Sequence, residues 1–514
     1  MHAEQAYLFR HTLLRDAAYQ LQLPTERARL HKLALELIES LLGGTPEEPG
    51  LSHQGGSTWV AHPSDAMAAE LADHARLAQP QDSPQDPGLL KLRRIYAWRA
   101  AEFSERTYRP IEALGHWREH AQIAQGVAQA ESLRRAAILA STYAAAHDAE
   151  SMCHDALRIF REAGHRRGEA LVHGVLGGVY RHLRRIDEAQ QAHQAALAIF
   201  GEIGDKHSQA ISLSNLAIAH HECGRPGEAE QLYRQALAIH QTEGDELSQG
   251  TTLSKLAALL QETGHNAESE RMHQRALEHL RREGNKRVEG IALGYLANVY
   301  HETGRQELAE RTLQESLALL RQVGDRRHEA VVIGYLANVS AALGQMPRAE
   351  QAYEQAVGIF RELGDQRMEG VVLGNLASLH LETGRFEQAR VTGEIALSLH
   401  RRSGNLRSEG ILLGNLALAY SRLGASEKSE PCYEQALAIH RRVRNRLFEG
   451  VHLCEFAAFL AGEKREAEAR ERFDQGAALL AELHADSELA RLEAMMREAR
   501  AKAKSRPSDE GAAI

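Results

Sequence analysis

Apolar and polar residues alternate with a helical period through most of this chain. Residues 371–404 read VVLGNLASLHLETGRFEQARVTGEIALSLHRRSG, in which Leu373 and Leu376 lie on one apolar face and Ala389 and Ala396 lie on another. A Gly-Arg pair separates the two faces. Because spacings of three, four and seven residues place side chains on one side of an α-helix, the pattern predicts two amphipathic helices joined by a tight turn.

The helix pair returns at a fixed interval of forty residues. The interval holds for small residues, which let helices approach closely, and for glycines, which end helices. A residue just beyond a helix often takes a positive φ, and glycine has no Cβ penalty in that conformation. The repeating positions are Gly204, Gly244, Gly284, Gly324, Gly364 and Gly404; Gly224, Gly264, Gly304, Gly344, Gly384 and Gly424; and Ala217, Ala257, Ala297, Ala337, Ala377 and Ala417.

An Asp or Asn follows each glycine of the first series. Its side chain can accept a hydrogen bond from the unpaired N–H groups that open the next helix, so each of these residues is expected to be an N-cap. The predicted caps are Asp205, Asp245, Asn285, Asp325, Asp365 and Asn405.

One repeat carries large, small, aromatic, glycine, alanine, aromatic and alanine residues in the order Leu216, Ala217, His220, Gly224, Ala229, Tyr233 and Ala236. This motif resembles the tetratricopeptide repeat, and the forty-residue length is similar to that of repeats in kinesin light chains and in polarity adaptors with GoLoco motifs. The resemblance implies an all-α fold, an α-solenoid of helix-turn-helix repeats that forms a right-handed superhelix. Its concave groove would be lined by the first helix of each pair.

Four segments are expected along the chain. About nine forty-residue repeats occupy residues 124–483, and irregular helices with Pro- and Gly-rich loops at residues 43–123 form degenerate capping repeats. A C-terminal capping helix and a disordered tail are expected at residues 484–514. The remaining segment, residues 1–42, is expected to be helical but does not follow the period.

The stretch from Tyr7 to Ser40 resembles the junction between the winged helix and the tetratricopeptide arm of bacterial STAND signalling ATPases. This sequence contains no GxxxxGK[ST] phosphate loop, so it is not itself such an ATPase. The resemblance implies a remnant of that junction, or the sensor arm of a signalling system whose NTPase or kinase domain is encoded upstream.

Composition excludes several classes of function. The formal net charge is −9 and charged residues are dispersed, so no basic patch for nucleic acid is expected. The four cysteines lie far apart in the sequence, which argues against a disulfide framework and a zinc knuckle. The sequence has no signal-peptide pattern and no apolar run long enough to span a membrane, so a cytoplasmic location without a membrane partner is expected.

The 28 histidines are better explained by packing than by chemistry. His193 and His273 take a repeat position that is Tyr233 in another repeat, which indicates a packing role. His221 and His301 precede a glutamate as in a zincin helix, but the second histidine is missing, and the chain has no GxSxG elbow. We therefore expect no enzymatic activity, no metal and no cofactor; the one enzymatic alternative is a pocket formed by distant repeats.

Asparagine and tyrosine recur on the first helix of the repeats. An amide has a donor and an acceptor, so a ladder of amides can bond the backbone of an extended peptide, as asparagines do in the similar adaptor and kinesin-type repeats. Alternatively, the amides bond neighbouring helices and stabilise the stack. Gly294 and Gly334 beside the tyrosines, with the equivalent Gly374 and Gly414, are expected to leave room for a ligand. The candidate groove residues are Asn215, Asn298, Asn338, Asn375, Asn415, Tyr295 and Tyr335.

The charge of the ligand is less constrained. Positions that hold arginine in adaptor repeats are Ile, Val or Thr here, so an acidic ligand is not expected. Glutamates near the end of the first helix form either an acidic stripe for a basic ligand or ion pairs with arginines three residues later, and pairing is favoured. These residues are Glu222, Glu262, Glu302 and Glu382, with Arg225, Arg305 and Arg385.

The sequence thus favours a protein-protein interaction scaffold that binds a peptide or protein segment in a concave groove. The alternative function is a sensor or regulatory arm of a STAND-type ATPase, kinase or cyclase system.

Overall fold

The computed structural model describes residue 19 and residues 22–49, 59–80, 84–143, 146–183 and 185–505. Every regular element in these ranges is a helix, with no strand among them, so the prediction of an all-α fold is confirmed. None of the helices in the described ranges is long and apolar enough to cross a membrane. The chain divides into two compact units, Met1–Cys223 with Gln231–Glu243 and Gly224–Glu230 with Gly244–Ile514.

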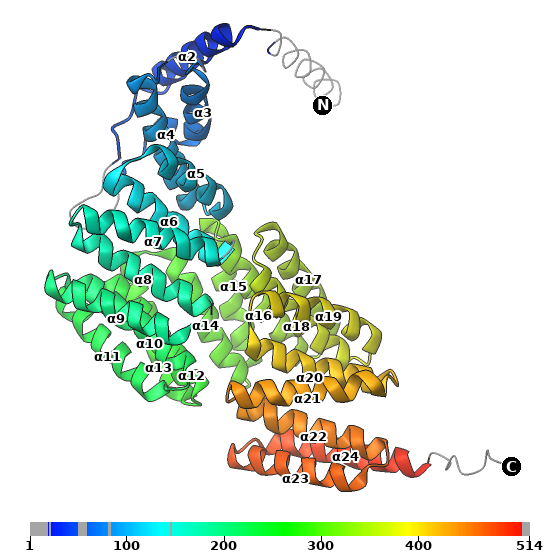
Figure 1. The fold of residues 1–514 in the computed structure, drawn as a ribbon. Coiled ribbons are helices and arrows are strands. Elements are labelled where there is room, and N and C mark those ends of the chain that lie inside the picture. Colours follow the sequence, from blue (N-terminus) through cyan, green and yellow to red (C-terminus); the bar gives the residue numbers. More distant parts are fainter. Residues whose placement is uncertain are drawn as a thin grey trace. The chain divides into compact units, whose positions relative to one another are not determined.

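Unit 1 is a succession of helices in which each contacts the next from α2 to α10 (Figure 1). Its helices are α2 (Pro24–Leu41), the 3₁₀ helix η1 (Pro63–Met67), α3 (Ala68–Leu77), α4 (Pro87–Arg106), α5 (Pro110–Ile123), α6 (Gly126–Tyr143), α7 (Ala146–Glu162), α8 (Arg166–His182), α9 (Ile186–Glu202) and α10 (Lys206–Glu222), with most of α11 (Pro226–Glu243).

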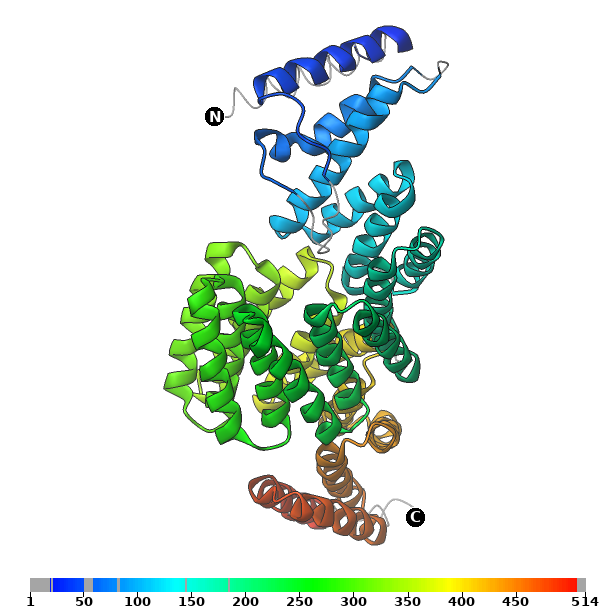
Figure 2. The ribbon, with the colours of Figure 1, turned by 90° about the vertical axis from the view of Figure 1, so that its left-hand side faces the viewer.

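Unit 2 continues in the same manner, with contacts between every pair of consecutive helices from α12 to α24. The order can be followed by colour, from green to red, in Figure 2. Its helices are α12 (Glu246–Glu262), α13 (Asn266–Glu283), α14 (Lys286–Glu302), α15 (Gln306–Val323), α16 (Arg326–Ala342), α17 (Met346–Glu362), α18 (Gln366–Glu382), α19 (Phe386–Arg402), α20 (Leu406–Arg422), α21 (Ser426–Arg442), α22 (Arg446–Gly462), α23 (Glu466–Glu482) and α24 (Asp486–Ser505).

We call the first helix of each repeat the A helix and the second the B helix. In unit 2 the A helices are α12, α14, α16, α18, α20 and α22, and α24 stands forty residues after α22. A helices of neighbouring repeats contact each other at α12–α14, α14–α16, α18–α20 and α20–α22. Side chains at one position of the A helix therefore recur on a shared layer of the stack.

Each A helix approaches its own B helix closely at the fifth A-helix residue. In α12 this residue is Gly250, and a Cβ placed on it would lie 2.7 Å from Cγ of Leu280 in α13. A Cβ on Gly370 or Gly410 would lie 3.2 or 3.0 Å from the ring of His400 or His440 in the B helix. A small residue at this position is what lets the two helices of a repeat pack.

The turns follow the glycine pattern. All twelve glycines of the two sequence series have positive φ, from 64° at Gly404 to 83° at Gly264. At the C-terminal end of the array the same positions hold other residues, Arg444, Lys464 and His484, which nevertheless adopt φ of 54°, 63° and 55°. The turn geometry is thus imposed by the stack, and these last turns tolerate a conformation that costs a non-glycine residue roughly 1–2 kcal/mol.

The predicted N-caps are observed. Asp325 accepts a hydrogen bond from the backbone N–H of His328 (3.1 Å) and also from Nε of Arg287 in the preceding A helix (2.6 Å). Asp365 does the same with Met368 and with Arg327 (3.1 and 2.9 Å). The aspartate cap therefore joins two repeats as well as opening one helix.

A second polar contact also crosses repeats. An arginine near the end of a B helix bonds a glutamate eight residues later, in the first turn of the next A helix. The Nε-to-carboxylate distances lie between 2.7 and 2.9 Å in six such pairs, which are Arg161–Glu169, Arg281–Glu289, Arg321–Glu329, Arg361–Glu369, Arg401–Glu409 and Arg441–Glu449.

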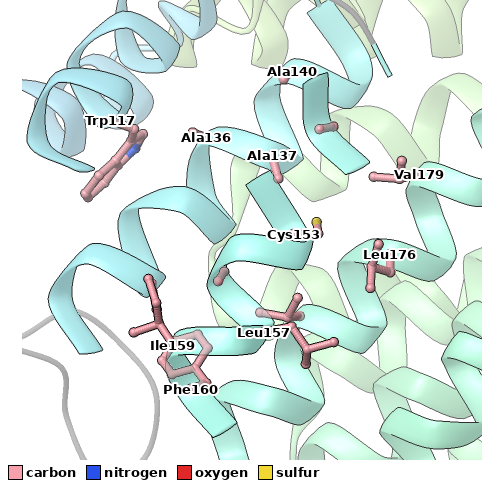
Figure 3. Packing of buried hydrophobic residues seen from close by; sticks show 14 of the residues in the cluster. Trp117, Ala136, Ala137, Ala140, Cys153, Leu157, Ile159, Phe160, Leu176 and Val179 are labelled. Atoms are coloured by element: carbon pink, nitrogen blue, oxygen red, sulfur yellow. The ribbon is translucent and has the colours of Figure 1, made fainter. Parts of the chain in front are cut away.

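The core of unit 1 shows how alanine-rich helices close over larger side chains. Figure 3 shows Cys153, Leu157 and Phe160 in succession along α7, with Ala137 of α6 and Leu176 of α8 near Cys153. All five are buried. Burial raises the pKa of the Cys153 thiol to about 12, so this cysteine is a packing residue rather than a nucleophile.

The predicted ends of the array stand as follows. Residues 1–18, which hold part of the STAND-like resemblance, and the tail at residues 506–514 lie outside the described residues. Within residues 1–42 the structure describes helix α2, and within residues 43–123 it describes η1 and α3–α5. The four-segment division remains a prediction.

Gly250→Ala is expected to destabilise the protein although alanine is the better helix former. The new methyl group would overlap the Leu280 side chain, and overpacking of this kind costs about 1–3 kcal/mol. Gly358 in α17 is the matched control, because nothing lies within 4 Å of its Cβ position. Gly358→Ala should stabilise by about 0.5–1 kcal/mol. Urea unfolding of both variants measures the difference, and two changes of the same sign would contradict the packing argument.

Buried histidines fill B-helix positions as the repeat pattern predicts. The imidazole of His273 is fully buried, and neither ring nitrogen has a hydrogen-bond partner among the described residues. Burial lowers its pKa from 6.5 to about 4. The unfolded chain therefore takes up this proton at a higher pH than the folded chain, and the stabilisation is complete above pH 6.5 and is lost as the pH falls through 4.

His273→Tyr should make the protein more resistant to acid. Tyrosine occupies the equivalent position at Tyr233, Tyr353 and Tyr433, so the side chain fits the repeat. Between pH 7 and pH 4.5 the variant should lose about 2 kcal/mol less stability than the parent. Thermal unfolding across this range tests the difference, with the exposed His147→Tyr as control. Equal pH profiles for the parent and His273→Tyr would rule out this contribution.

Candidate peptide-binding groove

The candidate groove residues of unit 2 form a stripe along its A helices. Tyr295, Tyr335, Asn375 and Asn415 occupy the tenth position of α14, α16, α18 and α20. Tyr295 is 37% exposed and Asn375 is exposed, whereas Tyr335 and Asn415 are half-buried. We call this series, from Tyr295 to Asn415, the groove stripe.

Two amides bond within the stack. The hydroxyl of Tyr353 in α17 donates to Oδ1 of Asn338 in α16 at 2.5 Å, which ties the two helices of one repeat. Asn415 donates from Nδ2 to the hydroxyl of Ser378 in α18 at 2.9 Å, which ties adjacent A helices. For these two asparagines the alternative of a stacking role is supported by direct contacts.

The other amides are differently placed. Asn298 is half-buried and donates to Glu302 on its own helix at 3.3 Å. Asn375 is exposed and makes no hydrogen bond to any described residue, so both its donor and its acceptor are open to a ligand. Asn215 lies half-buried on α10 in unit 1 and is therefore not part of the unit 2 stripe.

The two tyrosines lie close to each other. The Tyr295 ring stacks against His273 of α13, with 6.3 Å between the ring centroids. Burial raises the pKa of the Tyr335 hydroxyl, and the neighbouring Tyr295 and Glu302 raise it further. Aromatic faces and hydroxyls thus mark one stretch of the stripe, and amides mark the next.

Two of the four glycines beside the stripe do not leave room for a ligand, so the prediction is wrong for Gly414 and Gly294. A Cβ on Gly414 would lie 2.1 Å from the ring of His452 in α22, and one on Gly294 would lie 3.3 Å from Val332 in α16. At these two positions a side chain of the next A helix occupies the space, so the small residue serves close packing of A helices. At Gly334 and Gly374 the nearest atoms lie 3.8 and 3.9 Å from the Cβ position, and the prediction remains open there.

The favoured ion pairing at the end of the A helices is also wrong. Arg305 and Arg385 pair with Glu270 and Glu350 of the preceding B helices, each at 2.8 Å. Arg225 lies 3.8 Å from Glu228, and Glu222 pairs with Arg181 at 3.0 Å. Arg305 and Arg385 also donate from Nε to the hydroxyls of Thr303 and Thr383, at 3.0 and 2.9 Å.

One edge of the stripe is consequently acidic. Glu302 and Glu382 are exposed at the last position of α14 and α18, and Asn298 links Glu302 to the stripe through its amide. At the other ends of the A helices, Arg287 and Arg327 are bonded to the aspartate caps. The sequence carried a signal for these arginines, since they recur forty residues apart, but their partners lie in the next repeat.

Comparison with known proteins identifies the repeat. The family model of the tetratricopeptide repeat matches residues 168–242, 248–322, 329–402 and 372–442, more than half of the chain. A comparison with curated proteins gives no significant match.

Three solved structures show the range of similar proteins. A Rap protein complexed with competence and sporulation factor is 14% identical, with 68% of this chain and 98% of that chain covered and a TM-score of 0.49. A STAND protein with a tetratricopeptide repeat sensor from Pyrococcus horikoshii is 15% identical (85% and 66% covered, TM-score 0.43). A putative kinesin light chain from Podosopora anserina is 18% identical (39% and 99% covered, TM-score 0.33).

Asn338→Ala should destabilise the protein, and Asn375→Ala should not. Removing the Asn338 amide leaves the buried Tyr353 hydroxyl without its partner, at a cost of about 1–3 kcal/mol. The exposed Asn375 side chain bonds no described residue, so its truncation should stay within about 0.5 kcal/mol of the parent. Thermal unfolding distinguishes the two variants, and equal stabilities would mean that the Asn338 contact does not hold the stack.

Proposed function

The chain belongs to the tetratricopeptide repeat family, and from that premise we propose that unit 2 binds an extended segment of a protein partner along its A helices. A repeat scaffold offers a long surface on which one side-chain position recurs, which suits a ligand with a recurring backbone. The groove stripe is such a position.

The observation that carries the proposal is the open state of two residues of the stripe. Asn375 has neither donor nor acceptor engaged by a described residue, and Tyr295, two repeats earlier, exposes more than a third of its surface. A polar side chain whose only role was to stabilise the stack would be bonded, as Asn338 and Asn415 are. Asn375 and Tyr295 are therefore the residues assigned to the ligand.

The charge at the groove edge supports a basic segment. The exposed Glu302 and Glu382 lie on one edge of the A-helix layer, and Arg305 and Arg385, which the sequence predicted to neutralise them, pair with Glu270 and Glu350 instead. Negative charges gathered at the edge attract a positively charged ligand and speed its association. A segment rich in lysine or arginine fits this edge better than an acidic one.

Selection from a displayed library of random peptides tests the proposal. We expect enriched peptides to carry a net positive charge and to bind the parent in solution, as measured by calorimetry. Asn375→Ala and Tyr295→Ala should each weaken binding by about tenfold, equivalent to about 1.4 kcal/mol. Glu449→Gln, away from the stripe on α22, is the control. Peptides that bind both groove variants as tightly as the parent would refute the groove assignment.

A second function is favoured by one feature of unit 1. Leu30, Leu33, Leu37 and Leu41 are exposed along one side of α2, within the segment that resembles a STAND junction. An apolar helix face of this kind would suit contact with an upstream NTPase or kinase domain, for which unit 2 would be the sensor arm. An in-frame phosphate loop in the upstream coding sequence would support this function, and a stop codon between the two would contradict it.

A further inference from the structure

The groove stripe continues onto the last A helix of the array as a carboxylate. Glu455 stands at the tenth position of α22, forty residues after Asn415. Whereas Asn375 is exposed, Glu455 is only 5% exposed. The acidic character of the groove edge thus reappears at one end of the stripe, in a buried position.

Helix α24 is the reason for this burial. Elsewhere in unit 2 an A helix contacts the B helix before it more extensively than the A helix before it, whereas α24 contacts α22 more extensively than α23 (Figure 1). Its buried residues Leu492 and Met496 face this contact. The α24 helix therefore closes over the tenth position of α22.

A pocket of 390 Å³ remains between α20, α22 and α24. Its walls include Leu418 of α20, Phe459 of α22 and Met495 of α24, and Glu455 and Tyr433 line it as well. Its charged side chains are Glu455, Glu463 and Glu498 against Arg422 and Lys502, and Lys502 bonds Glu498 at 2.5 Å. The volume is within the range of small-ligand sites.

Two residues that line this pocket each have a buried polar atom without a partner among the described residues. These atoms are Oε2 of Glu455 and the hydroxyl of Tyr433, whose residue is fully buried. The other oxygen of Glu455 accepts a long hydrogen bond from Arg491, at 3.4 Å, and Arg491 is held more closely by Glu488, at 2.5 Å. Buried polar groups are normally satisfied, so two orphans beside one cavity mark a place for a ligand.

The chemistry of the lining selects a cation. Glu455 offers a carboxylate oxygen and Tyr433 a hydroxyl oxygen, both hydrogen-bond acceptors. The Tyr433 ring stacks on Phe456 at 5.1 Å and lies 6.3 Å from Phe459, so aromatic surface surrounds the acceptors. Carboxylate and aromatic rings together are the usual recognition elements for ammonium and guanidinium groups.

We infer that the pocket between α20, α22 and α24 binds one ammonium or guanidinium group through Glu455 and Tyr433. The inference deepens the proposed function, because the pocket forms the C-terminal end of the groove stripe and would anchor a basic side chain of the bound segment. Arg491 and Arg422 face Glu455 as well, but burial still raises the pKa of this carboxyl to about 7, so its negative charge is incompletely compensated.

The probes are agmatine, which carries a guanidinium and an ammonium group, and a blocked pentapeptide with one central arginine. The same peptide with glutamine in place of arginine is the neutral match. Calorimetry at pH 8 should give saturable binding of agmatine and of the arginine peptide only. Binding at pH 6 should be about fivefold to tenfold weaker, because the carboxyl is then largely protonated.

Glu455→Gln should weaken binding of both cationic probes at least about tenfold. Glu449→Gln on the same helix, whose carboxylate pairs with Arg441 at 2.8 Å, should leave binding unchanged. Glu455→Gln removes a buried charge, so its melting temperature at pH 8 should equal or exceed that of the parent, which checks the fold. Ala499→Leu fills the pocket from α24 and should also block binding.

Preference for the arginine peptide over agmatine would identify the anchored group as part of a chain, and the reverse preference would identify a free amine. Equal binding of the glutamine peptide, unchanged affinity in Glu455→Gln, or no binding of either cation at millimolar concentration would overturn the inference. None of these results depends on Asn375 or Tyr295. A failed pocket therefore leaves the groove proposal to its own test, and a failed groove leaves the pocket to this one.

Discussion

The structure depends on the close approach of the two helices within each repeat. Where Gly250 faces Leu280, a single added methyl group would come within 2.7 Å of the leucine side chain. Each repeat has only its neighbours to cover its apolar face, so a wider separation of its two helices would displace the next A helix. The A-helix layer, and with it the regular spacing of the groove stripe, exists because glycine or alanine holds this position in repeat after repeat.

Polar contacts then fix the register that packing allows. Glu329 accepts bonds from Arg321 of the previous B helix at 2.9 Å and from Arg326 of its own helix at 2.8 Å, while its side chain is 6% exposed. Pairs of this kind add little stability, but they penalise a shifted arrangement that would leave a buried carboxylate alone. In two repeats both members of the arginine–glutamate pair are replaced. These positions hold Gly201 and Gln209 in one repeat, and Gln241 and Gln249 in the other.

The sequence predicted what is local and missed what crosses between repeats. Turn glycines, N-caps and the faces of helices follow from residues a few positions apart, and these predictions held. The pairing of Arg305 with Glu270 and the filling of the space beside Gly414 by His452 depend on how neighbouring helices cross. A periodic pattern identifies the face of a side chain, but it does not specify the distance to the adjacent helix. The groove stripe was therefore predictable as a set, whereas the separate roles of its asparagines were not.

Glu455 shows that one repeat position can have different roles in different repeats. Tyrosine, asparagine and glutamate succeed one another at the tenth A-helix position, and only the glutamate is covered by a further helix, α24. Burial without full compensation makes the ionised carboxyl unfavourable at neutral pH, so a hydrophobic residue would serve the stack better. A cation that enters the pocket removes this penalty at the contact between α22 and α24. Ligand binding at the groove end and docking of the last helix would then stabilise each other, because both depend on the buried carboxylate of Glu455.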